Sequence, residues 1–250
     1  GISYMDCGDM AASRQCLEQA LEINTAAGSR SDQALDLGWL GKLHWLLKDY
    51  SVAASYLDRA LDLDRDLGGG EEEDWHWMWR SAVACESGDL EAARIYLQRA
   101  QELRAQGNGN VMACDAALQL AHIEFAEGNI GVAEDHARQA LAEAQANHTH
   151  PIKLGEALTL LGRIQSHEAF AGEDNAEACF REALTHLQDI APTVYTRAMT
   201  LYHYGRYLDR KGQFKEAQVH LNTASVIFER MGVSPSFTRS VNVSPDAFDK

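Results

Sequence analysis

The sequence contains little proline, no closely spaced cysteines and no long apolar run, and each shortage argues against a class of protein. Only four prolines occur in 250 residues, so little interrupts helix formation. The five cysteines are odd in number and widely spaced, which indicates reduced thiols and a cytoplasmic location rather than a disulfide framework. No apolar run approaches the roughly 18 residues that a membrane-spanning helix needs.

Positive charge is also scarce. The chain has 22 Lys and Arg against 37 Asp and Glu, a formal net charge of −15. Nucleic-acid phosphates and anionic membranes would repel such a chain, so we expect neither as a partner. Hydrophobic residues make up 46% and charged residues 24%, which is typical of a soluble chain that forms a core.

The sequence motifs of the common enzyme classes are missing. There is no nucleophile elbow, no H-E-x-x-H zinc motif and no dinucleotide-binding fingerprint. His148 and His150 could offer two metal ligands, but no third lies nearby. The conspicuous stretch GGGEEED, residues 68–74, matches neither an EF-hand nor a P-loop. We therefore expect no catalysis, no metal and no cofactor.

What the sequence does contain is a long internal repeat. Within each unit a small residue lies five positions after a turn residue, a usually larger one lies nine after, and an alanine lies twelve after. These offsets fall on one face of a helix, where small side chains let a neighbouring helix approach. Six units begin, at spacings of 40, 40, 40, 43 and 41, at Gly8, Lys48, Gly88, Gly128, Ala171 and Gly212.

A second helical segment precedes each turn. It is marked by an L-G or Y-G pair seven to eight residues upstream, as in LGKLHWLL before Lys48 and LYHYGRYL before Gly212. Gly68 falls where a unit should end, and the acids from Glu71 to Asp74 would open the next helix at the positive end of its dipole. Each unit is therefore predicted to be a helix A, a tight turn and a helix B.

This pattern resembles the tetratricopeptide repeat, through the L-G pair, the G-D turn and the small, large and alanine positions of helix B. The resemblance runs from Gly1 to about Met231 and implies an all-α solenoid of antiparallel helix pairs wound into a right-handed superhelix. The period exceeds the family's usual length of about 34 residues. A long-period array of this type is similar to the repeat domains of large bacterial signalling and regulatory proteins. HEAT and armadillo repeats have a comparable period but lack this turn.

Residues 1–232 are predicted to form one solenoid of about six units, and residues 233–250 a tail or linker without helical period. The first unit is expected to be truncated, because Gly1 falls where the glycine of the L-G pair falls elsewhere. A truncated first helix would expose apolar surface, so a homo-oligomer formed through the ends of the array is one expectation.

The resemblance implies that helix A lines a concave groove that holds a peptide or protein. The candidate groove residues, aromatic in the first half and basic in the second, are Trp39, Lys42, Trp45, Trp75, Met78, Trp79, His122, Phe125, Arg163, His167, Tyr202, Arg206 and Arg210. Trp77 is instead expected to face the neighbouring helix. The clamp that some tetratricopeptide domains use for a terminal carboxylate is not matched, since its positions in units two to four hold Gly38, Lys42, Trp79, Asp115 and Gln119.

We therefore predict a non-catalytic scaffold that binds a protein or peptide and serves as the sensor or docking domain of a larger multidomain regulator. Two alternatives stay open at this point. One is a receptor of the same fold for a small ligand or signal peptide. The other is a structural module that self-associates.

Overall fold

The computed structural model describes residues 1–107, 112–146, 151–167, 175–188, 194–234 and 237. All regular elements in this part of the chain are α-helices, which confirms the predicted fold class. In order they are α1 (Ile2–Asp6), α2 (Met10–Ala27), α3 (Arg30–Leu46), α4 (Tyr50–Leu67), α5 (Glu73–Glu86), α6 (Leu90–Ala105), α7 (Ala113–Ala126), α8 (Ile130–Ala146), α9 (Pro151–Gln165), α10 (Ala176–His186), α11 (Val194–Arg210) and α12 (Phe214–Met231).

The stretch GGGEEED ends one helix and begins the next, as predicted. Gly68 caps α4 with a φ of 79°, a left-handed conformation that glycine adopts without steric cost. Helix α5 then begins at Glu73, with Glu73 and Asp74 in its first turn. Their carboxylates lie at the positive end of the helix dipole, so the acidic run is explained by helix initiation.

The glycine of the L-G or Y-G pair lets helix A and helix B of one unit approach closely. A Cβ atom added to Gly41 of α3 would lie 2.5 Å from Cγ of Leu57 in α4. The equivalent Gly205 of α11 has Cγ of Leu221 in α12 at 2.7 Å. The pair is therefore recurrent because the large residue of helix B occupies the place where a side chain on helix A would stand.

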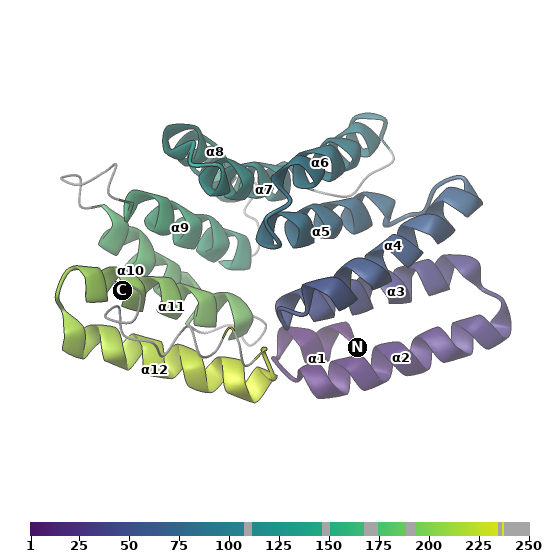
Figure 1. The fold of residues 1–250 in the computed structure, drawn as a ribbon, viewed down its shortest axis with the longest axis horizontal. Coiled ribbons are helices and arrows are strands. Elements are labelled where there is room, and N and C mark those ends of the chain that lie inside the picture. Colours follow the sequence, from purple (N-terminus) through teal and green to yellow (C-terminus); the bar gives the residue numbers. More distant parts are fainter. Residues whose placement is uncertain (108–111, 147–150, 168–174, 189–193, 235–236, 238–250) are drawn as a thin grey trace.

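The first helices of successive units form one continuous layer. Helix α3 packs on α5, α5 on α7, α7 on α9 and α9 on α11, while each second helix packs mainly on first helices. The small positions of the repeat lie between them, and Ala60, Ala100 and Ala140 have no exposed surface. The units follow one another around a curve (Figure 1).

The two ends of the array meet. The turn between α1 and α2 reaches the last unit, since a Cβ on Gly8 would lie 3.1 Å from Cγ1 of Val194. The amide of Ser234 donates to the carbonyl of Leu47 at 3.0 Å. Figure 1 shows α1 and α2 beside the end of α12.

This closure changes one expectation about the ends. Met5 and Met10 near the start of the chain are buried and share a core cluster with Phe228 and Met231 of α12. The first unit therefore exposes only part of its apolar surface: Met5 and Met10 are covered by the last unit, whereas Ile2 and Tyr4 of α1 are 41% and 48% exposed. Of the predicted tail, Val233 is buried, and residues 238–250 lie outside the described part of the chain.

Candidate binding site inside the array

Three of the predicted groove tryptophans and one lysine form a compact group, called here the tryptophan cluster: Trp39, Trp75, Trp79 and Lys42. The ring centroids of Trp39 and Trp79 lie 5.0 Å apart, and those of Trp75 and Trp79 lie 5.9 Å apart. The Lys42 ammonium lies 4.7 Å from the Trp39 ring and 5.2 Å from the Trp79 ring, within the range of a cation–π interaction.

The cluster is less open than the sequence suggested. Trp79 is only 5% exposed, whereas Trp39 and Trp75 are half-buried, and all three pack on the core between α3, α4 and α5. Met78 is also 5% exposed and lies in the core shared by α5, α6 and α7, so, like Trp79, it offers a ligand little surface. Its side chain fills a gap between helices because it lies about 100° around the helix from its neighbour Trp79.

Trp45 belongs to a different arrangement, which the sequence did not reveal. The Glu86 carboxylate at the end of α5 accepts hydrogen bonds from Trp45 Nε1 at 2.8 Å, Lys48 Nζ at 2.6 Å and Tyr50 Oη at 2.8 Å. Burial alone would raise the pKa of Glu86, but Lys48 and these donors lower it below its ordinary value. The Lys48 ammonium also lies 5.6 Å from the Tyr195 ring of α11.

Lys48 occupies the turn position that glycine fills in most units. Its φ is 65°, the one positive value at a non-glycine residue in the described part of the chain. Such a conformation costs roughly 1–2 kcal/mol for an ordinary side chain. The ion pair with Glu86 offsets part of that cost and joins the second unit to the third. The Lys48 side chain is only 5% exposed.

A second ion-pair group links α7 to α9. Lys153 Nζ lies 2.7 Å from Oδ1 of Asp115 and 2.8 Å from Oε2 of Glu156. The charges of Lys153, Glu156 and Asp115 also act on Lys42, whose pKa is lowered mainly by desolvation. The interior between the tryptophan cluster and α9 is therefore charged, and sequence reasoning missed these residues because their partners are far apart in the chain.

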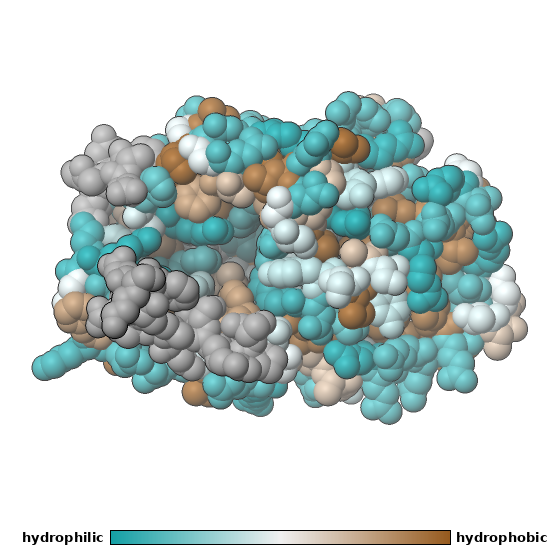
Figure 2. Space-filling model, viewed as in Figure 1, coloured by the Kyte–Doolittle hydropathy of each residue, from teal (hydrophilic) through white to brown (hydrophobic). Residues whose placement is uncertain are grey.

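The predicted basic residues do gather in one hollow, called here the arginine pocket. It has a volume of about 260 Å³ and lies between α7, α9 and α11; its walls are Phe125, Arg163, Ser166, His167, Tyr202, His203, Arg206 and Arg210. The Arg163 guanidinium lies 4.7 Å from the Phe125 ring. Arg210 donates to the Ser166 hydroxyl at 2.8 Å. In the same view as Figure 1, Figure 2 shows a hollow near the centre of the molecule.

Two histidines of this interior have lowered pKa values, because they are desolvated and lie near Arg163. His122 of α7 is exposed to the interior, yet desolvation and then the charge of Arg163 lower its pKa to about 4. Desolvation, Arg163 and His122 lower the pKa of His203 of α11 well below its usual range. Both imidazoles are therefore neutral near pH 7, where each can donate one hydrogen bond and accept another.

Two polar pairs, one partly buried and one buried, join neighbouring units at equivalent positions of the repeat. The Asn24 amide of α2 donates to Asp36 of α3 at 2.7 Å, and Nδ1 of His76 in α5 lies 2.7 Å from Asp64 of α4. His76 and Asp64 are 1% and 2% exposed at the side chain. These pairs satisfy buried polar groups between helices, so we assign them to the stability of the array.

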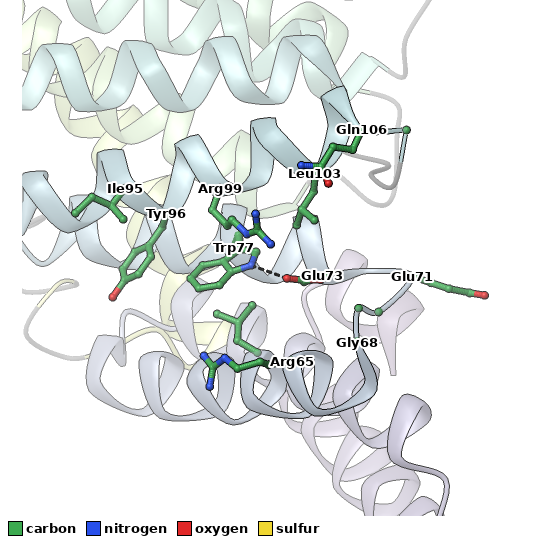
Figure 3. Close-up of a pocket in the computed structure, with 14 residues that line it drawn as sticks. Arg65, Gly68, Glu71, Glu73, Trp77, Ile95, Tyr96, Arg99, Leu103 and Gln106 are labelled. Carbon is green, nitrogen blue, oxygen red and sulfur yellow. Dashed lines mark hydrogen bonds between the residues drawn. The ribbon is translucent and has the colours of Figure 1, made fainter.

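A larger hollow lies outside the interior, between α4 and α6. Its volume is about 1140 Å³, and Figure 3 shows Trp77 at its floor between Arg65 of α4 and Tyr96 of α6. Trp77 stacks on Tyr96 at 5.6 Å between ring centroids and donates to Glu73 at 3.1 Å. The residue thus faces the neighbouring helix, as predicted, but stays half-buried. Two arginines and two glutamates line it, Arg65, Arg99, Glu71 and Glu73, so this outer groove has no charge of one sign to select a ligand.

Among the described residues, no group of three or more His, Cys, Asp or Glu side chains is arranged to hold a metal ion. The candidate ligands His148 and His150 lie outside those residues. None of the helices is both long enough and apolar enough to cross a lipid bilayer within the described ranges.

Comparison with known proteins agrees with this architecture. Residues 1–66 match the sequence model of the tetratricopeptide repeat. These residues are similar to tetratricopeptide repeats, and the described chain continues as an array of helix pairs of the same kind. Its period is longer than the usual unit of about 34 residues, and the glycine contacts described above explain the L-G pair on which the resemblance rests. No curated protein matches it.

Two solved structures share the fold of the array. A crystal structure of BtubC from P. vanneervenii is 16% identical, with a TM-score of 0.57, and the match covers 90% of this chain and 91% of that one. A crystal structure of a Rap protein complexed with Competence and Sporulation Factor is 15% identical, with a TM-score of 0.60, and the match covers 96% of this chain and 73% of that one. At these identities the likeness concerns the fold alone. Repeat arrays of this kind typically serve protein interaction and are typically non-catalytic.

Proposed function

We propose that the array binds a peptide or an extended protein segment along its interior, without catalysis, as the sensor or docking domain of a larger regulator. The observation that carries the proposal is the group of positively charged side chains inside an acidic protein. The whole chain has a net charge of −15, yet Lys42, Arg163, Arg206 and Arg210 gather among the interior side chains of α3, α9 and α11.

The composition of this surface favours a peptide that has both apolar and acidic residues. Aromatic rings and arginine provide most of the energy at typical protein interfaces. Trp39 and Trp75 keep part of their surface accessible, and the arginine pocket is lined by other helices, α7, α9 and α11. The similar Rap protein, crystallised in complex with Competence and Sporulation Factor, supports a peptide as the kind of ligand.

A receptor for a small ligand is a second candidate, because the arginine pocket has a volume of about 260 Å³ and would enclose only part of a peptide. Self-association has less support. It rested on exposed apolar surface at the first unit, and of that surface Ile2 and Tyr4 stay exposed while Met5 and Met10 are buried against the last unit.

The test is selection of short peptides from a random library by the purified wild-type chain, followed by titration of the selected peptides. Lys42→Gln removes an interior charge, and Lys215→Gln removes an exposed charge on α12 as the matched control. Binding should weaken about tenfold or more in Lys42→Gln and stay unchanged in Lys215→Gln. Equal affinity in both variants would show that the peptides bind elsewhere and would refute the proposal.

A further inference from the structure

The arginine pocket contains three guanidinium groups and no carboxylate. Arg163 reaches it from α9, and Arg206 and Arg210, one helical turn apart, reach it from α11. The other residues that line it contribute hydroxyl, imidazole and phenyl groups. A guanidinium remains protonated at any physiological pH, so the pocket has about three positive charges.

Carboxylates neutralise many arginines elsewhere in this acidic chain. Seven lie on a carboxylate: Arg30, Arg65, Arg80, Arg94, Arg99, Arg138 and Arg181. By contrast, no ion pair joins Arg163, Arg206 or Arg210 to a carboxylate of the described residues. Glu86 acts on Arg163 only at longer range, and its oxygens already accept from Lys48, Tyr50 and Trp45.

The partly buried position of Arg163 makes its missing counter-charge costly, whereas Arg210 is more exposed. Desolvation lowers the pKa of Arg163 and of Arg210, the latter also through repulsion from Arg206. The Arg163 guanidinium lies over the Phe125 ring, 4.7 Å from its centroid. Cations held close together in partly desolvated surroundings favour the binding of an anion that neutralises them.

We propose that the arginine pocket binds a dianionic oxyanion, of which the phosphoryl group is the common biological form. One guanidinium fork saturates a single carboxylate, whereas three forks provide donors for an anion with three or more oxygens and two charges. The neutral imidazole of His203 and the Tyr202 hydroxyl add uncharged donors on α11. On this basis the ligand of the array carries a phosphoryl group, which lies between α9 and α11 when the ligand is bound.

The arginine pocket would bind the phosphoryl group whether or not a peptide is attached to it. Only the peptide part of the ligand rests on the proposed function. Inorganic phosphate probes the pocket without any peptide. If phosphate binds and no peptide does, the peptide function fails and the anion site stands. If peptides bind in the interior but phosphate neither binds nor competes with them, the anion site alone fails.

Calorimetric titration of the whole chain with inorganic phosphate at low ionic strength tests the pocket. We expect saturable binding by the wild type, a weakening of at least tenfold in Arg163→Gln, and no change in Arg99→Gln, whose arginine is paired with Glu102 on α6. Arg206→Gln serves as a second pocket variant if Arg163→Gln does not fold, as judged by circular dichroism. Higher salt should weaken binding, because the contacts are ionic.

Acetate and sulfate at matched concentrations separate the anion classes. Sulfate should compete with phosphate, and acetate should not. Equal binding of acetate would make the pocket a carboxylate site and overturn the proposal, as would unchanged phosphate affinity in both pocket variants. A phosphorylated peptide that binds no better than its unphosphorylated form, while free phosphate binds, would assign the pocket to a free phosphoryl compound.

Discussion

Replacing glycine by alanine at two helical positions should change stability in opposite directions. At Gly41 the new Cβ would lie 2.5 Å from Leu57 Cγ and 3.3 Å from the carbonyl oxygen of Ala53. Leu57 has no exposed surface, so it cannot turn away into solvent. At Gly131, near the start of α8, nothing lies within 4 Å of the new atom.

Two effects of known size decide the sign. Alanine is favoured over glycine in a helix by up to about 1 kcal/mol, less in the first turn. Overpacking a close contact costs about 1–3 kcal/mol, and here one of the two nearest groups is backbone. Gly131→Ala should therefore raise the free energy of unfolding by a few tenths of a kcal/mol. Gly41→Ala should lower it by up to about 2 kcal/mol once its propensity gain is subtracted from the overpacking cost.

The assay is urea denaturation followed by circular dichroism, together with thermal melting. For a chain of this size 1 kcal/mol corresponds to a Tm change of roughly 2–4 °C, so Gly41→Ala should melt several degrees below the wild type. Repeat arrays can unfold in parts, so hydrogen exchange in α3 and α4 should locate the loss there. A Gly41→Ala protein as stable as Gly131→Ala would mean that the two helices do not approach as described.

Three further changes test other parts of the structure. Glu86→Gln should lower stability at pH 7 by about 1–2 kcal/mol in urea denaturation, because Lys48 loses its counter-charge. The pKa of Glu86 is lowered in the folded state, so this advantage of the wild type is present above the carboxyl's ordinary pKa of 4.5. It should shrink as the pH falls below that value, and a pH-independent difference would contradict the ion pair. Ala140→Leu should cost about 1–3 kcal/mol by overpacking a position with no exposed surface, and a neutral result would mean that the position is open. Met78→Ala should lower stability by about 2–5 kcal/mol through cavity formation, measured in the same way, whereas a groove residue would lose little.

The sequence was sufficient to predict the helix pairs and the places where helices end. Both depend on residues close together in the chain. The alanine twelve positions after each turn and the glycine seven before it fall on faces that the helical period defines. Gly68 and the acids that follow it act through local backbone geometry and the helix dipole. The gathering of Arg163, Arg206 and Arg210 was also predictable, because the repeat places them on equivalent faces of α9 and α11.

Other features depend on the tertiary structure. The pairing of Lys48 with Glu86, the contact of Lys48 with Tyr195 and the burial of the first unit against the last join residues far apart in the sequence. The Lys48–Glu86 pair depends on how the second unit packs on the third, and the other two contacts follow from the curvature that accumulates over six units. The burial of Met78 has a related cause. One residue is about 100° of helix, so a repeat alignment cannot separate a groove position from a core position beside it until the neighbouring helices are in place.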